Sequence, residues 1–269
     1  MTEKLYYQDA YLREFEAVVS AISDLGVALN RTVFYPGGGG QPNDTGELIR
    51  DRQPYPVSAV RIQDGEIWHA VEAGALQVGD PVNGSLGWNR RYGLMRIHTA
   101  MHILCGVIWR DYRASVTGGN MEPLRGRMDF EFERMQKELV SEIEARVNQE
   151  VAAARPLRSQ VLPRAEAFRI PDLIRTKINL LPDGIQQVRV VEIDGLDLQA
   201  DGGTHVANTR EVGRIQIVDY KSKGRINKRL RIEDYVLDLM PRCFEQVQKA
   251  TGEPDYTLFG YCMGGLFGL

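Results

Sequence analysis

The first 88 or so residues alternate short apolar stretches with residues that favour turns. Apolar runs such as 55–62 are bounded by Asn43-Asp44, Asp64-Gly65, Gly79-Asp80 and Asn83-Gly84. Short β-prone segments separated by such pairs are typical of antiparallel strands joined by tight turns. The pattern predicts a small N-terminal β-barrel over residues 1–88.

From residue 90 the pattern changes to helical spacing. Apolar side chains recur three or four residues apart between residues 94 and 108, and again between residues 139 and 147. This spacing predicts one helix starting at residue 90 and a second over 133–154. Strand-like runs follow at 187–193 and 214–220. Because strands and helices come in groups and do not alternate regularly, we predict an α+β protein.

The composition is that of an ordinary water-soluble protein. The chain has 269 residues, of which 43% are hydrophobic and 26% charged, which is enough for two domains. It contains no apolar run near the roughly 20 residues that span a bilayer, and its N-terminus lacks a signal-peptide pattern. Its three cysteines, 105, 243 and 262, form neither a disulfide framework nor a CxxC site. We therefore expect a cytoplasmic protein that does not bind membranes.

Positive charge is concentrated near the C-terminal third, although the net charge is only −3. Residues 210–231 contain eight Lys or Arg residues against Glu211 and Asp219. Over 225–232, Arg225, Asn227, Arg229 and Arg231 alternate with Ile226, Lys228, Leu230 and Ile232, so a strand here would have one polar, basic face. Such a face can simply protect a sheet edge, but beside a metal site it favours contact with a phosphate backbone. The residues predicted to bind nucleic acid are Arg225, Lys228, Arg229 and Arg231.

Three of the four histidines fall in two short segments. His98 and His102 lie four apart in the predicted helix, so both imidazoles can reach one metal ion. A lone pair of this kind is weak evidence, but Asp201 and His205 lie far downstream and can supply a carboxylate and a third imidazole. The four residues predict a divalent-metal site. His69, in a strand-like segment, is predicted to be structural.

Three separated motifs resemble those of the alanyl-tRNA editing proteins. They are FYPGGGGQPNDTG at 34–46, HTAMH at 98–102 and GGTHVANT at 202–209, and the similarity extends in order from about residue 32 to residue 232. These AlaX-type proteins are freestanding relatives of the editing domain of alanyl-tRNA synthetase. The resemblance implies a translation-protein-like barrel over 1–88, followed over 89–233 by the metal-dependent editing domain shared by threonyl- and alanyl-tRNA synthetases.

The resemblance also implies zinc, with one departure in the ligand set. The family uses His-x-x-x-His and Cys-x-x-x-His, and this chain has Asp201 where the cysteine is expected. A carboxylate is a harder ligand than a thiolate, so manganese, iron and cobalt are candidates beside zinc. Alternatively, Asp201 does not ligate, and three histidines leave open positions for water. Cys105 lies too far along the helix to ligate together with His98, and we predict an inert core thiol.

The implied activity is hydrolysis of the ester bond of mischarged tRNA(Ala), without ATP. The expected substrate is Ser-tRNA(Ala), with Gly-tRNA(Ala) as a second candidate, while Ala-tRNA(Ala) is spared. Catalytic and pocket-forming roles fall on Gly202, Gly203 and Thr204, and substrate binding on Gly38, Gly39, Gly40, Gln41, Thr117 and Asn120. Two alternatives stay open: a non-catalytic tRNA-binding protein with a weakened metal site, and a fusion whose tail binds a partner.

Residues 234–269 do not resemble the editing proteins. They predict an amphipathic helix over 235–247 and then a short apolar strand that leads into Gly260-x-Cys262-x-Gly264. This order resembles the nucleophile elbow of polyhydroxyalkanoate synthases. In hydrolase order the base that activates the thiol follows the elbow, but the sequence ends at Leu269. The tail is predicted to be a truncated hydrolase-like fragment in which Cys262 is not catalytic.

Overall fold

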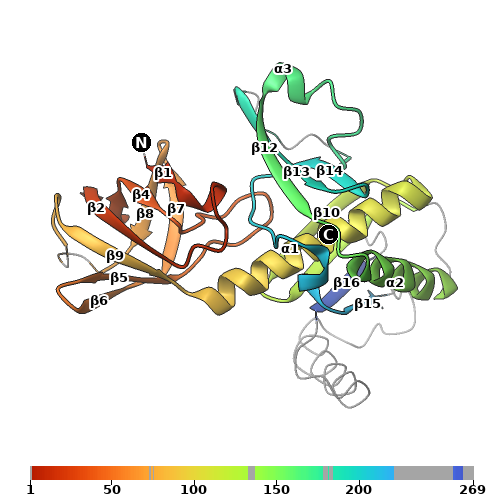
Figure 1. Cartoon of the computed structure of the whole chain (residues 1–269), viewed down its shortest axis with the longest axis horizontal. Coiled ribbons are helices and arrows are strands. Elements are labelled where there is room, and N and C mark those ends of the chain that lie inside the picture. Colours follow the sequence, from red (N-terminus) through yellow and green to blue (C-terminus); the bar gives the residue numbers. More distant parts are fainter. Residues whose placement is uncertain are drawn as a thin grey trace, which may run out of the picture.

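The computed structural model describes residues 2–72, 74, 76–132, 137–177, 181, 184–220 and 257–262. A long helix, α1 (Trp88–Tyr112), connects an N-terminal sheet to the rest of the molecule (Figure 1). Beyond the helix lie a four-stranded sheet with a second helix and a separate three-stranded sheet. The mixture of helices and sheets agrees with the predicted class.

The N-terminal part is built on a seven-stranded antiparallel sheet with the order β6-β5-β9-β2-β3-β8-β7. Its strands are β2 (Glu14–Ser23), β3 (Gly26–Leu29), β5 (Gly46–Arg50), β6 (Gln53–Val57), β7 (Ala59–Gln63), β8 (Glu66–Ala70) and β9 (Pro81–Leu86). The short strands β1 (Glu3–Lys4) and β4 (Arg31–Thr32) form a parallel pair, with the 3-10 helix η1 (Leu5–Tyr7) after β1.

This sheet is open, so the prediction of a β-barrel was wrong. The end strands β6 and β7 follow one another in the chain, but among the described residues they do not pair with each other. Pro54 and Pro56 occupy alternate positions of β6 and therefore lie along one edge of that strand. Proline has no N–H to donate to a ladder, which confines it to edge strands. These two prolines are therefore consistent with the edge position of β6.

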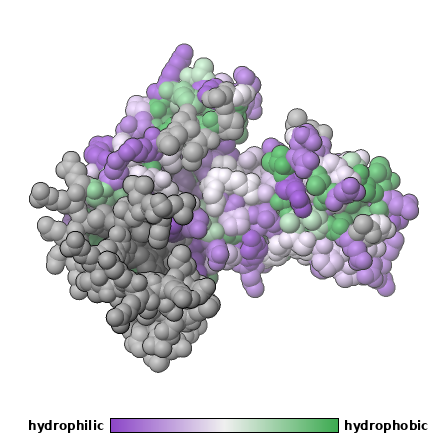
Figure 2. Space-filling view, turned by 180° about the vertical axis from the view of Figure 1, so that it is seen from behind, coloured by the Kyte–Doolittle hydropathy of each residue, from purple (hydrophilic) through white to green (hydrophobic). Residues whose placement is uncertain are grey.

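The N-terminal core lies on one face of the sheet. Along β2 exposed and buried residues alternate, and Phe15, Ala17 and Val19 point inward. The outer side keeps some apolar side chains in solvent, such as Val18 and Ile22, and apolar surface is visible on this part of the molecule in Figure 2. The core is therefore one-sided, as expected for an antiparallel sheet that faces water.

His69 has the structural role that the sequence predicted. It is fully buried in β8, where its Nδ1 lies 3.1 Å from the carbonyl oxygen of Val27 and its Nε2 lies 2.8 Å from Thr32 Oγ1. Burial lowers the pKa of His69 to about 4. The ring is therefore neutral at ordinary pH, with Nδ1 donating to the carbonyl and Nε2 accepting from the hydroxyl.

A buried ion pair joins the start of α1 to the N-terminal part. The Arg91 guanidinium is fully buried and donates to both carboxylate oxygens of Asp44, with Nε at 3.0 and 3.1 Å. It also donates to the backbone carbonyls of Ala10 and Val33, and Asp44 accepts the backbone N–H of Tyr35 at 2.6 Å. Every charge in this group is compensated, and the contacts fix the glycine-rich segment against α1.

The second part surrounds the C-terminal half of α1. The antiparallel hairpin of β10 (Val116–Glu122) and β11 (Arg125–Phe130) belongs to a four-stranded sheet with the order β10-β11-β16-β15. Helix α2 (Lys137–Ala152) packs against α1 and against β15 (Ile215–Tyr220). The shared core contains Leu94, Ile97, Ile143 and Val147. Both helices and the strand over 214–220 lie where the sequence predicted them.

A three-stranded antiparallel sheet completes the described structure. It consists of β12 (Leu157–Pro163), β13 (Gln187–Ile193) and β14 (Asp197–Ala200), with the short helix α3 (Arg164–Ala167) after β12. Asp201 follows β14 directly. The 3-10 helix η2 (Thr209–Val212) comes after the loop that contains His205. Among the described residues, none of the helices is long and apolar enough to cross a membrane.

The strand β16 (Thr257–Cys262) corrects the prediction for the tail. It lies between β11 and β15 and pairs parallel with both, with Leu258 opposite Arg125 and Thr257 opposite Ile215. The predicted truncated fragment thus supplies a strand to this sheet, and the backbone groups of its two neighbours complete its ladder. The predicted basic strand at 225–232, the helix at 235–247 and residues 263–269 lie outside the described residues.

Candidate metal centre

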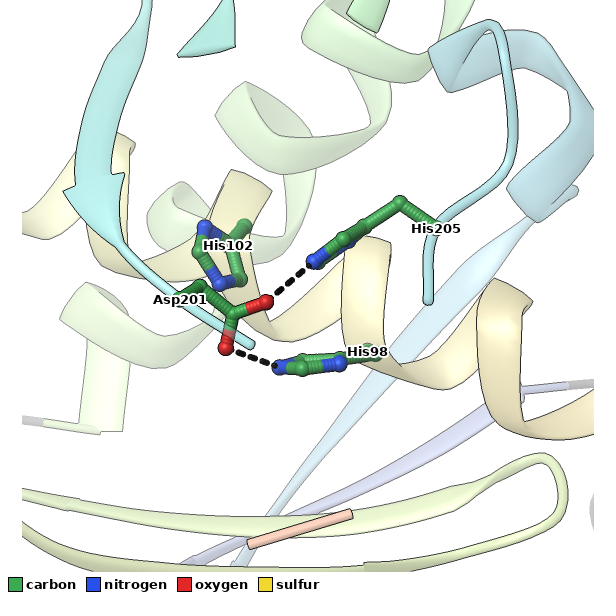
Figure 3. A group of neighbouring side chains, drawn as sticks. All are labelled: His98, His102, Asp201 and His205. Atoms are coloured by element: carbon green, nitrogen blue, oxygen red, sulfur yellow. Dashed lines mark hydrogen bonds and ion pairs between the residues drawn. The ribbon is translucent and has the colours of Figure 1, made fainter. Parts of the chain in front are cut away.

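Three imidazoles converge beside α1. His98 and His102 project from one face of the helix, and His205 reaches them from the loop after β14 (Figure 3). The ring centroids lie 5.2 Å apart for His98 and His102, 4.3 Å for His98 and His205, and 4.8 Å for His102 and His205. The four-residue spacing on the helix accounts for the first pair.

Asp201 completes the group with a carboxylate. Its Oδ2 lies 2.9 Å from His205 Nε2, and its Oδ1 lies 3.4 Å from His98 Nε2. One ligand atom from each of the four residues lies within 4.8 Å of every other. The side chains of His98, Asp201 and His205 are only 5 to 8% exposed. The structure thus brings together the four residues that the sequence singled out.

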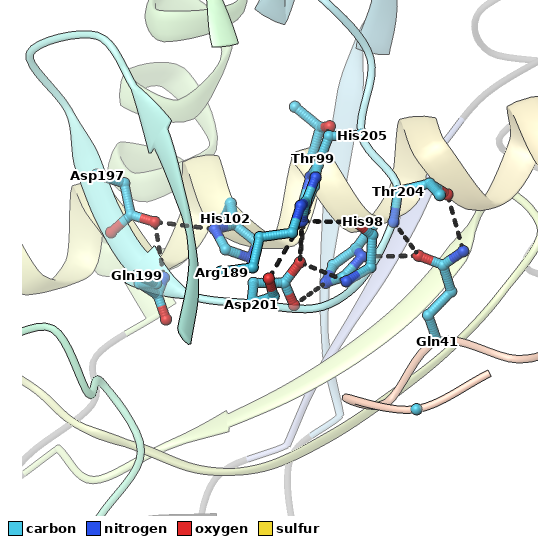
Figure 4. Close-up of polar contacts among 12 residues, drawn as sticks. Gln41, His98, Thr99, His102, Arg189, Asp197, Gln199, Asp201, Thr204 and His205 are labelled. Carbon is cyan, nitrogen blue, oxygen red and sulfur yellow. Dashed lines mark hydrogen bonds and ion pairs between the residues drawn. The ribbon is translucent and has the colours of Figure 1, made fainter. Parts of the chain in front are cut away.

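A neighbouring group holds the second nitrogen of each ring (Figure 4). The pairs are His98 Nδ1 with Gln41 Oε1 at 2.9 Å, His102 Nδ1 with Asp197 Oδ2 at 3.0 Å, and His205 Nδ1 with Thr99 Oγ1 at 3.2 Å. Histidines that bind metals usually have such a partner, which fixes the tautomer and the orientation of the ring. With Nδ1 engaged in all three rings, Nε2 is the nitrogen available at the centre.

Electrostatics at Asp201 and His205 favour the forms that bind cations, whereas Asp197 favours the protonated form of His102. Burial raises the pKa of Asp201, but His98 and His205 outweigh this effect and hold the pKa well below its usual value. Burial and the neighbouring His98 lower the pKa of His205 well below its usual value. Burial also acts to lower the pKa of His102, but the hydrogen bond and charge of Asp197 raise it overall. A carboxylate and neutral imidazoles are what a metal ion requires.

This donor set fits a divalent metal ion. Three imidazole nitrogens and one carboxylate oxygen are ligands of zinc in proteins, and they equally suit manganese, iron and cobalt. Cys105 lies in the wall of the adjacent cavity and is buried, and burial raises the pKa of its thiol well above the usual value. This agrees with the prediction of an inert thiol.

The loop 201–203 is held by Arg189, a residue that the sequence analysis missed. Arg189 Nη1 donates to the carbonyl oxygens of Asp201, at 3.1 Å, and Gly203, at 2.9 Å. The N–H of Gly203 in turn donates to Asp201 Oδ2 at 2.7 Å. At Gly203 a Cβ atom would lie 2.3 Å from Cε1 of His98, so only glycine allows the ring and the loop to pack together.

A cavity of about 670 Å³ is lined by three of the four candidate ligands, His98, His102 and Asp201. Its walls come from β10, from the segment 173–177 and from the glycine-rich loop. The sequence predicted six substrate-binding residues. Four of them line the cavity: Gly39, Gly40, Thr117 and Asn120. Gly202, from the predicted catalytic set, also lines it. The cavity therefore joins segments that lie far apart in the sequence.

Other predicted residues lie behind the ligands. Gln41 is buried, and its amide group contacts His98 and both the N–H and the hydroxyl of Thr204, each of the latter two at 2.9 Å. The carbonyl of Gly38 accepts a hydrogen bond from Tyr35 at 3.0 Å. Gln41 and Thr204 thus form a support for His98 in this structure. The tRNA-binding candidates at 225–231 lie outside the described residues.

Two family profiles match this chain. Residues 4–90 match the profile described as tRNA synthetases class II (A), and residues 188–231 match the threonyl and alanyl tRNA synthetase second additional domain. The alanyl-tRNA editing protein AlaX-M of Methanosarcina barkeri is 39% identical over 237 residues, which cover 86% of this chain and 98% of that protein. The chain belongs to the AlaX-M alanyl-tRNA editing proteins.

Further relatives support this assignment. The AlaX-M protein of Saccharolobus solfataricus is 40% identical over 233 residues, covering 86% of this chain and 98% of its own. The alanine–tRNA ligase of Methanothrix thermoacetophila is 37% identical over 220 residues, which are 81% of this chain but 24% of the ligase. The resemblance stated from the three motifs is confirmed. The resemblance of the tail to polyhydroxyalkanoate synthases is not supported, since it depended on one short strand and elbow pattern.

Proposed function

We propose that this AlaX-M protein hydrolyses mischarged tRNA(Ala) in a metal-dependent reaction, with Ser-tRNA(Ala) as its main substrate and Gly-tRNA(Ala) as a second one. The observation that carries the proposal is the cluster of His98, His102, Asp201 and His205 beside a cavity of about 670 Å³. Ligand pockets of small molecules occupy roughly 300–1,000 Å³, so an aminoacylated nucleoside end fits this volume.

Within the proposed site the four candidate ligands hold the ion, and their neighbours keep them in place. A bound divalent ion supplies polarisation of the ester carbonyl and a lowered pKa for water. Gln41, Thr99 and Asp197 orient the imidazoles, and the loop 201–203 places the carboxylate. The cavity wall holds the aminoacyl end beside these groups.

Discrimination against alanine requires a polar group that recognises the serine hydroxyl. A site built to hydrogen-bond a hydroxyl can reject an analogue without it by about 10⁴ to 10⁵. Thr117 and Asn120 of β10 line the cavity and are exposed, which makes them the candidates for this contact. Thr204 is only 1% exposed and its hydroxyl already accepts from Gln41. We assign Thr204 to the support of His98 and not to recognition of serine.

The proposal is tested by measuring metal content and deacylation in the same preparation. Protein purified without added metal is analysed for bound ions and then incubated with Ser-, Gly- and Ala-tRNA(Ala). We expect hydrolysis of the first two substrates, loss of activity after chelation and recovery on adding the ion. Binding of tRNA without hydrolysis at any metal loading would favour the non-catalytic alternative. The arginines and lysine at 225–231 are proposed to contact the tRNA backbone.

Replacing Asp201 by cysteine tests its role as a ligand. Because a thiolate is softer than a carboxylate, Asp201→Cys is expected to retain or increase zinc affinity and to weaken manganese affinity. Asp201→Ala serves as the variant without a ligand at this position. Competition with a coloured chelator gives the dissociation constants for both ions. A zinc affinity of the cysteine variant as low as that of the alanine variant would show that Asp201 does not ligate.

A further inference from the structure

Asp197 occupies a fully buried position behind the candidate ligand His102. Its side chain is 0% exposed, and its Oδ2 is shared between His102 Nδ1 at 3.0 Å and Gln199 Nε2 at 2.7 Å. Its other oxygen, Oδ1, makes no hydrogen bond in the described part of the chain. A buried carboxylate needs a compensating charge, because leaving one unpaired is strongly unfavourable.

Arg175 is the cation that faces this oxygen. Its Nε lies 3.6 Å from Asp197 Oδ1, and its side chain is only 10% exposed. Within the described residues, Arg175 Nε and Nη1 also make no hydrogen bond. Two groups of opposite charge, neither with a hydrogen-bond partner, therefore face each other at a distance slightly longer than a hydrogen bond. The Cζ atom of Arg175 lies over the ring of Trp109 in α1, 4.8 Å from the ring centroid.

The position of Arg175 in the chain connects this pair to the substrate cavity. The segment 173–177 forms part of the cavity wall, and its backbone is tied to β10, since Val116 N–H donates to the carbonyl of Arg175 at 3.0 Å. Lys177 N–H donates to the carbonyl of Val116 at 2.9 Å. The same segment thus borders the cavity and supplies the charge behind His102.

Two explanations for the buried guanidinium can be compared. A residue that binds a substrate phosphate should have its positive charge free, but Arg175 lies 3.6 Å from Asp197 and 3.9 Å from Asp172. These two carboxylates already compensate its charge. The geometry therefore favours a positioning role through Asp197 over direct contact with an anionic substrate.

We propose that Arg175 is a positioning residue that acts through Asp197 and His102 on metal binding. This inference rests on the proposed function only in taking His102 as a metal ligand. Arg175 fixes the carboxylate, the carboxylate fixes the ring through Nδ1, and Nε2 stays directed at the centre. The cavity wall and the metal site are thereby joined by one buried ion pair.

The test measures Co²⁺ binding by its absorption spectrum in the full chain. Removal of an outer-shell partner of a metal ligand lowers metal affinity by roughly 10- to 100-fold, and we expect a loss in this range for Arg175→Met and for Asp197→Asn. Arg175→Lys, which keeps the charge, should recover part of the affinity. In the Asp197→Asn background, Arg175→Met should change the affinity by no more than about 3-fold, since interacting residues are not additive.

The double variant also guards against a folding defect, because it removes both buried charges together. Arg169→Met is the matched control: this exposed arginine belongs to the same connection between β12 and β13, and its variant should bind Co²⁺ like the wild type. Wild-type affinity in Arg175→Met would overturn the proposal. An equal loss of Co²⁺ affinity on adding Arg175→Met to the wild type and to Asp197→Asn would also overturn it. So would an effect of Arg175→Met that is confined to KM for aminoacyl-tRNA at saturating metal.

Failure of the proposed function would look different. A wild-type protein that binds Co²⁺ but hydrolyses no aminoacyl-tRNA would contradict the deacylase assignment, and the affinities of the variants would still test Arg175. Conversely, unchanged affinities together with normal deacylation by Arg175→Met would contradict the role of Arg175 alone.

Discussion

Gly203→Ala is expected to weaken metal binding and deacylation strongly. A Cβ atom at this position would lie 2.3 Å from Cε1 and 2.4 Å from Nδ1 of His98, and 2.6 Å from Oε1 of Gln41. Neither ring nor amide can move aside without breaking the hydrogen bond that orients His98. We expect metal affinity to fall at the upper end of the roughly 10- to 100-fold range known for outer-shell changes, with activity falling at least as far.

The neighbouring glycine offers a matched control for metal binding. At Gly202 a Cβ atom would meet only the hydroxyls of Tyr7 and Tyr35, at 3.7 and 3.8 Å, which are ordinary contacts. Gly202→Ala should therefore retain the metal, and Gly184→Ala, where nothing lies within 4 Å, should retain both metal and activity. Equal metal affinity in the variants at 202 and 203 would show that the contact with His98 does not matter.

Asp44→Leu is expected to be the most destabilising single change in the N-terminal part. It would leave the fully buried Arg91 without its carboxylate and would also remove the acceptor for the Tyr35 N–H. Breaking a buried pair by removing one partner lowers the free energy of unfolding by about 3–5 kcal/mol. Urea titration followed by circular dichroism measures this difference.

Two further variants check the cause of that loss. Asp24→Ala removes an exposed carboxylate in a turn and should change the free energy of unfolding by less than about 0.5 kcal/mol. Combining Asp44→Leu with Arg91→Leu removes both charges and should recover part of the stability. The result would argue against an ion pair if adding Arg91→Leu to Asp44→Leu lowered the free energy of unfolding further, by as much as an independent substitution would.

The helices were predictable from the sequence because apolar residues recur at helical spacing, and in α2 Ile143, Val147 and Val151 are buried at this spacing. Most of α1 is buried, including the apolar positions that recur from Leu94 to Ile108. Turn pairs and apolar runs could not predict whether the N-terminal sheet is open or closed, because open sheets and barrels share these features. Pro54 and Pro56 were the available signal, since proline marks an edge strand.

The candidate metal ligands were predictable because histidine is rare in this chain and the motif spacing is specific. The residues that hold the ligands were not, since Asp197, Arg189 and Arg175 reach the site only through the tertiary packing of β13, β14 and the cavity wall. Asp197 left one trace in the sequence, because it precedes Asp201 by four residues as Asp201 precedes His205. In a strand followed by a loop, a spacing of four residues does not place side chains together. Only the structure could therefore assign a role to Asp197.

The strand order β11-β16-β15 has a consequence for biosynthesis. The ribosome makes β11 and β15 before β16, yet β16 takes the place between them. The sheet therefore cannot assemble in the order of synthesis, and the facing edges of β11 and β15 have no partner until the later strand arrives. Unpaired edges of this kind invite pairing between chains. The edges of β11 and β15 that β16 covers are thus open to such pairing until the 257–262 segment has been made.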